Sequence, residues 1–192
     1  MVLPIVCYGN NILRQQCNSV SFDDSTIETL IEDMWKTLDS ADGCGLAAPQ
    51  VNSSLKLFIV NSRDTYLNMS KKQQKEYFDG DEGIKETFIN AEIIEYSDDL
   101  IAADEEGCLS IPNIYEVVKR PWKITIKYYN RKFQEIIQTF SGHTARIIQH
   151  EYDHTQGILY TDYLNPLRKQ LLRNKLNRVQ KEISRIRYPM IK

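Results

Sequence analysis

Apolar residues recur early in the chain with the spacing of an amphipathic helix. Six of them share one face at 3.6 residues per turn: Ile27, Leu30, Ile31, Met34, Trp35 and Leu38. Residues 25–28 (STIE) have the form of a capping box, which predicts the start of this helix. Asp42 and Gly43 predict its end. We therefore expect an amphipathic helix in the N-terminal part of the chain.

The middle of the chain has the patterns of β-strands. Residues 57–60 (LFIV) predict a short buried strand, and further strands are predicted at 88–94, 100–103 and 114–118. Residues 122–129 and 133–140 flank the tripeptide Asn130-Arg-Lys132 and predict a hairpin. The polar stretch 61–87 predicts a long surface loop with at most one helical turn.

Two helices are predicted after the strands. Ser141 is a suitable N-cap and Gly157 a suitable stop for a helix that carries residues 150–154 (HEYDH). A last helix begins near Asn165, with Pro166 in its first turn. Its apolar positions are Leu167, Leu171, Leu172, Leu176, Val179, Ile183 and Ile186.

Strands followed by helices favour an α+β fold. We expect antiparallel sheets packed around a central helix with residues 150–154, together with the N-terminal and C-terminal helices. The length of 192 residues suits one domain, residues 1–192, with a sizeable buried core. Within it we distinguish the surface loop 61–87 and a basic C-terminal helix and tail, residues 165–192.

Charge divides the chain into an acidic body and a basic end. Residues 165–192 carry nine Lys or Arg and one acid, net +8, and the other 164 residues carry a net charge of −10. This asymmetry is compatible with a polyanionic partner and equally with a solvated helix face. Apolar runs long enough to span a membrane and recognisable targeting segments are absent, and the cysteines form no Cys-x-x-Cys pair. We expect a cytoplasmic protein that binds neither membranes nor DNA.

The chemistry of the chain is concentrated in its histidine-rich helix. His150 and His154 are four residues apart, so they lie on one helical face and can bind one metal ion together. Glu151 can reach a water on that ion without being a ligand itself. This His-Glu-x-x-His pattern is typical of zinc hydrolases, although two incidental histidines on an amphipathic helix remain an alternative.

A third ligand is required, and several residues compete for the role. His143 is excluded because seven residues of helix place it about 10.5 Å before His150. Tyr160 stands where a metzincin would have its last histidine. A thermolysin-like site would need a glutamate on a later helix, but the only carboxylate side chain after Asp162 is Glu182, which lies in the basic tail. These exclusions leave a cysteine such as Cys108, or an upstream carboxylate.

Three stretches together resemble the motifs of the peptide deformylase family, in the same order. They are residues 43–50 (GCGLAAPQ), 106–110 (EGCLS) and 149–154 (QHEYDH). The resemblance extends from about residue 5 to residue 187 and implies removal of the formyl group from the N-terminal formyl-methionine of new peptides. It also implies one divalent metal ion per chain, commonly Fe²⁺ and otherwise Zn²⁺, Ni²⁺ or Co²⁺. Its ligands would be Cys108, His150 and His154.

The resemblance also implies roles for residues around the metal. The ion would lower the pKa of its water, and the resulting hydroxide would attack the formyl carbon. Glu151 would act as general base and then as general acid. The Gln50 amide and the Leu109 backbone N–H would stabilise the oxyanion, and the Gly45 carbonyl would hold the formyl N–H.

The substrate pocket is expected beside the same helix. Ile147 and Arg146 precede His150 by three and four residues, and Cys44 would approach from residues 43–50. Cys44 departs from the Val or Ile that is commoner in the family. Tyr115 stands where some members have a substrate-holding arginine, and Arg120 is the nearest replacement.

Two aspartates are candidates for a supporting role beside the ligand histidines. Asp153 and Asp162 could accept hydrogen bonds from the ligand histidines, but helix capping or surface ion pairs are equally compatible with their positions.

Formyl-methionyl nascent peptides are the expected partners, with the ribosome as a partner of the basic C-terminal helix. The alternatives are a zincin-type endopeptidase and a ribosome-associated module without catalysis.

Overall fold

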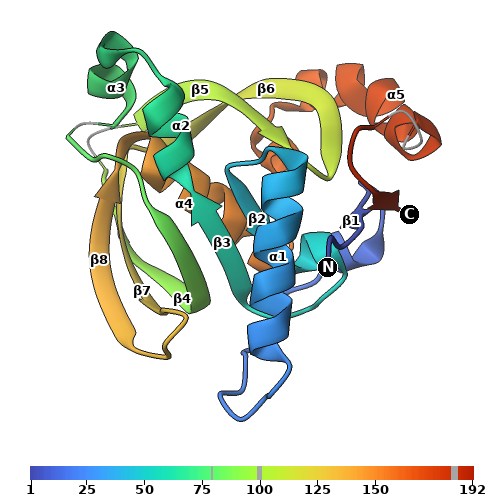
Figure 1. The fold of residues 1–192 in the computed structure, drawn as a ribbon. Helices are drawn as coiled ribbons and strands as arrows, with labels where there is room; N and C mark the ends of the chain where they lie inside the picture. Colours follow the sequence, from blue (N-terminus) through green and yellow to red (C-terminus); the bar gives the residue numbers. More distant parts are fainter. Residues whose placement is uncertain (79, 99–100, 183–185) are drawn as a thin grey trace.

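The chain folds into an α+β structure with antiparallel sheets and five helices in its described part (Figure 1). The computed structural model describes residues 1–78, 80–98, 101–182 and 186–192. A five-stranded sheet has the order β2-β3-β4-β7-β8, and β5 pairs with β6. Strand β1 (Ile5–Val6) pairs in parallel with β9 (Met190–Ile191). The predicted α+β class with antiparallel sheets is therefore confirmed.

Four strands of the five-stranded sheet coincide with predicted strands, whereas β2 was not predicted. Its strands are β2 (Gly45–Ala47), β3 (Leu57–Asn61), β4 (Lys85–Tyr96), β7 (Lys123–Tyr129) and β8 (Glu135–Ser141). Alternate residues of β7 are buried, as expected for a strand with one face on the core. The predicted hairpin is confirmed, because β7 and β8 pair from Lys123 and Ser141 to Tyr129 and Glu135.

The hairpin β5 (Ile101–Cys108) and β6 (Ile111–Pro121) is longer than the strands predicted at 100–103 and 114–118. Leu100 lies outside the described residues. Charged residues interrupt the apolar pattern in both strands, and three of them, Glu106, Glu116 and Arg120, are buried. The sequence pattern therefore underestimated both strands.

Helix α1 (Ile27–Ala41) is the predicted amphipathic helix. Its buried face packs with β2 and β3 in one hydrophobic cluster. The predicted capping box is wrong, because Thr26 precedes the helix without a side-chain cap, and Asp24 accepts hydrogen bonds from the Thr26 amide and hydroxyl instead. Asp42 ends the helix in the left-handed conformation, with φ of 55°.

Residues 61–87 are not the predicted surface loop. They form α2 (Ser62–Asn68) and α3 (Lys71–Phe78) before β4 begins. Asn61 caps α2 by accepting a hydrogen bond from the Asp64 amide at 3.2 Å. Phe78 is fully buried between Tyr66 and His143, with ring centroids at 5.2 and 5.7 Å. A few well-placed aromatic residues therefore anchor a segment whose composition is almost entirely polar.

Helix α4 (Gly142–Thr155) carries the histidines and passes alongside β2 and β3. Ser141 precedes the helix as its N-cap residue but makes no side-chain capping bond. Gly157 follows the end of the helix with φ of +74°. Nearly all of its residues are buried. The polar side chains of this helix therefore face protein, where each requires a partner or a ligand.

Helix α5 (Pro166–Glu182) is the predicted basic helix. Asn165 accepts a hydrogen bond from the Arg168 amide at 2.8 Å and so caps its start. Leu172, Leu176 and Val179 are buried, whereas Leu167 and Leu171 are 68% and 61% exposed. Ile183 lies outside the described residues. Within the described ranges, every helix is too short or too polar to cross a membrane.

Candidate metal centre and active-site pocket

Three side chains that the sequence singled out as metal ligands lie together. His150 and His154 project from one face of α4, with ring centroids 5.1 Å apart, and Cys108 comes from the end of β5. Their ligand atoms all lie within 4.8 Å of one another, and Cys108 Sγ is 3.2 Å from His154 Nε2. One thiolate and two imidazoles form a donor set that suits a divalent transition metal. The geometry thus fits one metal ion.

Glu106 orients the first of these histidines. Its Oε2 lies 3.1 Å from His150 Nδ1, and this contact favours the tautomer whose Nδ1 carries the proton and donates to the carboxylate. The sequence interpretation missed this role, although Glu106 lies in the motif that supplied Cys108. Asp153 and Asp162 were considered for it, but Asp153 binds Arg120 and Tyr163, and Asp162 pairs with Arg14.

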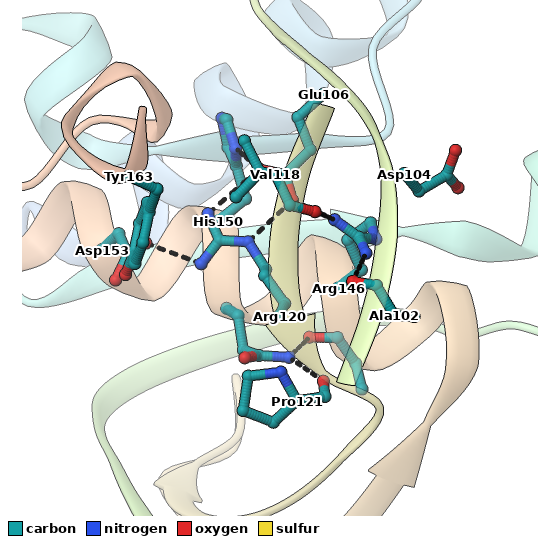
Figure 2. Close-up of polar contacts among 12 residues, drawn as sticks. Ala102, Asp104, Glu106, Val118, Arg120, Pro121, Arg146, His150, Asp153 and Tyr163 are labelled. Atoms are coloured by element: carbon teal, nitrogen blue, oxygen red, sulfur yellow. Dashed lines mark hydrogen bonds and ion pairs between the residues drawn. The ribbon is translucent and has the colours of Figure 1, made fainter. Parts of the chain in front are cut away.

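Two buried arginines, Arg120 and Arg146, hold the Glu106 carboxylate in place (Figure 2). Arg120 donates from Nε to Oε1 at 2.7 Å and from Nη2 to Oε2 at 3.0 Å, and its Nη1 donates to Asp153 at 2.8 Å. Burial raises the pKa of Glu106, but hydrogen bonds from His150 and Arg120 and the charge of Arg120 outweigh it, so the pKa is well below its ordinary value. Glu106 is therefore ionised at neutral pH, next to the candidate metal ligand His150.

The same contacts correct one expectation about Arg120. Its guanidinium is buried and fully engaged with Glu106 and Asp153, and it also lies over the Tyr163 ring at 4.8 Å. Arg120 therefore cannot replace a substrate-holding arginine. Tyr115 itself is 62% exposed at the pocket, where its ring packs on Gly107.

Arg146 is more constrained than the predicted substrate contact implied. Its Nη1 donates to Glu106 Oε1 at 2.5 Å and to the Val118 carbonyl at 3.1 Å, and its Nη2 donates to the Ala102 carbonyl at 2.8 Å. The side chain still lines the pocket. Its charge is already neutralised by Glu106, so only its remaining surface is available to a ligand.

Glu151 lies at the base of the pocket. The side chain is 4% exposed, and within the described parts of the chain its Oε2 has no hydrogen-bond partner. Burial raises the pKa of Glu151 to about 7. A buried carboxylate of this kind, beside a metal-type donor set, is typical of a general base.

Gln50 is held close to the Cys108 sulfur. Its Oε1 accepts a hydrogen bond from the Ala47 amide at 2.7 Å. Its Nε2 then lies 3.5 Å from Cys108 Sγ and 3.4 Å from Ser110 Oγ. The amide NH₂ therefore faces Cys108 and Ser110.

A pocket of about 1040 Å³ joins these groups. The predicted residues that line it are Cys44, Gly45, Gln50, Cys108, Leu109, Arg146, Ile147, His150 and Glu151. His154 lies beneath the pocket wall and is almost fully buried. Cys44 is exposed into the pocket, where desolvation by the pocket walls raises the pKa of its thiol to about 12. Cys44 is therefore a neutral thiol at physiological pH.

The fold and this site define a hydrolase with a metal-binding donor set. A family model described as polypeptide deformylase matches residues 2–170, and the chain belongs to this family of enzymes, which act in N-terminal processing during protein biosynthesis. Peptide deformylase of Christiangramia forsetii is 39% identical, in an alignment that covers 99% of this chain and 95% of that protein.

Solved structures agree with this assignment. The crystal structure of peptide deformylase from Ehrlichia chaffeensis has a TM-score of 0.81 at 28% identity, and covers 94% of this chain and 98% of that one. A class I type b peptide deformylase from Acinetobacter baumannii, solved with Met-Ala-Ser bound, has a TM-score of 0.73 at 30% identity. That match covers 85% of this chain and 99% of the other.

Proposed function

We propose that residues 1–192 form one catalytic domain that removes the formyl group from the N-terminal formyl-methionine of newly made proteins. One observation carries the proposal: Cys108, His150 and His154 converge on one point beside the Glu151 carboxylate, in a pocket open to a peptide. A divalent ion bound there, Fe²⁺ or else Zn²⁺, Ni²⁺ or Co²⁺, would lower the pKa of a water and polarise the formyl carbonyl.

Glu151 moves the proton. It accepts a proton from the attacking water and delivers it to the amine as the C–N bond breaks, so that formate and a free methionine amine result. Its burial supports both roles, because the raised pKa keeps the protonated and ionised forms close in energy.

Gln50 and Leu109 stabilise the oxyanion. The Ala47 amide holds the carbonyl end of Gln50, so that its NH₂ group lies beside Cys108 and Ser110, where it can donate to the formyl oxygen. The backbone N–H of Leu109 follows Cys108 directly and supplies the second donor. Removing one donor of this kind typically costs about 10²–10³ in kcat. The carbonyl of Gly45 accepts the N–H of the scissile amide.

The methionine side chain binds in the inner part of the pocket. Ile147 and Cys44 offer apolar surface there, and Arg146 adds the part of its side chain that faces the pocket. The bound Met-Ala-Ser of the A. baumannii relative is a peptide of the kind that deformylation would produce. A neutral Cys44 thiol is compatible with a thioether ligand.

Formate release from formyl-Met-Ala-Ser by anaerobically purified protein, with parallel metal analysis, tests the proposal. We expect one divalent ion per chain and formate release that Glu151→Gln abolishes while the metal remains bound. Glu135→Gln, on the distant β7–β8 hairpin, is the matched control. Cleavage of internal peptide bonds without formate release would instead identify an endopeptidase.

We further propose that α5 contacts the ribosome. Arg173, Lys175 and Arg178 are exposed on this helix. Neutralising all three should reduce co-sedimentation with ribosomes at moderate salt. Neutralising Lys71, Lys72 and Lys75 on α3 is the control for a similar loss of charge. Equal binding by both variants would contradict the role of α5.

A further inference from the structure

Two proposed active-site groups lie at the turn between β5 and β6: the Cys108 sulfur at its start and the Leu109 backbone N–H within it. Cys108 ends β5 and Ile111 begins β6, so Leu109 and Ser110 form the connection. The pairing of the two strands shifts register between Glu106 and Cys108. This irregular ladder gives the turn less support from its own hairpin, so its position depends on contacts from elsewhere.

Three other segments hold this turn. The Tyr188 hydroxyl donates to the Leu109 carbonyl at 2.8 Å, and the Tyr8 amide donates to the Ser110 carbonyl at 2.9 Å. Gln50 contributes the third contact, to Ser110 Oγ at 3.4 Å. Tyr8 and Tyr188 come from opposite ends of the chain, which lie close together in Figure 1.

The segment 186–191 is itself firmly anchored. Met190 and Ile191 pair with Ile5 and Val6, and the Ile5 amide donates to the Pro189 carbonyl at 2.8 Å. Arg187 donates to the Ala41 carbonyl at 2.9 Å, at the end of α1. The segment therefore has a fixed position relative to the turn.

This segment also lines the pocket. Ile186, Arg187 and Tyr188 face the cavity that contains Glu151, although the match to the family model ends at residue 170. Tyr188 is 9% exposed and packs in the same hydrophobic cluster as α1. Burial raises its pKa, so the hydroxyl keeps its proton and remains a donor.

We propose that Tyr188 is a positioning residue for the oxyanion site, an inference that rests on the proposed deformylase function. Its hydroxyl holds the Leu109 carbonyl, which restrains the Leu109 Cα atom and, through it, the adjoining peptide unit that bears the Leu109 N–H. A fixed donor stabilises developing negative charge without reorganisation, and a small displacement weakens that stabilisation. Segment 186–191 is thus part of the catalytic site and not an accessory tail.

Tyr188→Phe tests the inference, because it removes one hydroxyl and preserves the ring. We expect kcat for formyl-Met-Ala-Ser to fall on the order of tenfold, with KM and metal content unchanged. Backbone amide exchange in residues 108–111 should become faster, and the midpoint of thermal unfolding should change little. Tyr129→Phe is the matched control, because its hydroxyl donates to Glu135 on the distant hairpin at 3.0 Å.

The outcomes separate this inference from the proposed function. Wild-type protein that binds metal but releases no formate overturns both. Active wild type with Tyr188→Phe equal to Tyr129→Phe in kcat and in amide exchange overturns the role of Tyr188 alone. A loss of stability accompanied by a higher KM and an unchanged kcat would also overturn it, since that pattern indicates general structural damage.

Discussion

Gly45 lies directly against the Glu151 carboxylate. A Cβ atom at this position would be 2.5 Å from Glu151 Oε1 and 2.7 Å from its Cγ, closer than carbon atoms approach in proteins. The neighbour is a buried carboxylate on a packed helix, which has little room to move. Glycine is therefore required here by the proximity of the Glu151 side chain.

Gly45→Ala should inactivate the enzyme without unfolding it. The added methyl group would push the Glu151 carboxylate from its position, and we expect kcat to fall by about 10²-fold or more. Steady-state formate release measures the loss, and metal content and circular dichroism serve as controls. Full activity would show that Glu151 can act from another position.

Glu106→Gln should weaken metal binding. An amide cannot accept from both Arg120 and His150 as a carboxylate does, so the His150 ring would lose its fixed orientation. Changes of this kind typically cost about 10–100-fold in metal affinity or activity. The rate at which Co²⁺-substituted protein loses metal to a chelator gives the effect directly, through the thiolate-to-cobalt absorption band.

Glu116→Gln is the matched control for that experiment. Glu116 is also a buried carboxylate of the β5–β6 hairpin and binds Arg168 through two hydrogen bonds at 2.7 Å, but it does not contact the metal ligands. Its substitution should leave the metal-loss rate unchanged. Equal acceleration in both variants would contradict a specific role for Glu106.

Arg120→Met should destabilise the protein strongly. It would leave the Glu106 and Asp153 carboxylates buried with fewer partners, and breaking a buried ion pair typically costs about 3–5 kcal/mol. Urea unfolding of the metal-free protein separates this loss from any effect of metal binding. Arg14→Met removes an exposed ion pair to Asp162 and should cost much less.

Phe78→Ala should also destabilise the protein, because α3 is an anchored element. The side chain is fully buried against Tyr66 and His143, and truncation of such a phenylalanine costs about 3–5 kcal/mol. Leu67→Ala, at an exposed position of α2, should change the free energy of unfolding by less than about 0.5 kcal/mol. Equal effects of the two substitutions on the free energy of unfolding would show that Phe78 does not anchor α3.

The amphipathic helix and the β7–β8 hairpin were predictable because each has a local periodic pattern. The histidine helix was predictable from the spacing of its two histidines and from Ser141 and Gly157 at its ends. The ligand role proposed for Cys108 followed only from the resemblance, since spacing along the chain left an upstream carboxylate as an alternative ligand. Helices α2 and α3 were missed because Phe78 and Tyr66 bury a polar segment through contacts distant in sequence. Glu106 was missed as the partner of His150 for the same reason, since the two residues belong to different elements. Long-range contacts carry no local signal.

The parallel pairing of β1 with β9 has a consequence for how activity arises. Ile5 pairs with Met190, so almost the whole chain lies between the two strands. Closing so long a loop costs more conformational entropy, and is slower, than forming contacts between residues that are near in sequence. The turn that bears Leu109 receives Tyr8 and Tyr188 from these two ends. We therefore expect catalytic competence to lag behind the formation of the sheet and helices during folding, with the proposed oxyanion donor, the Leu109 N–H, among the last groups to reach its position.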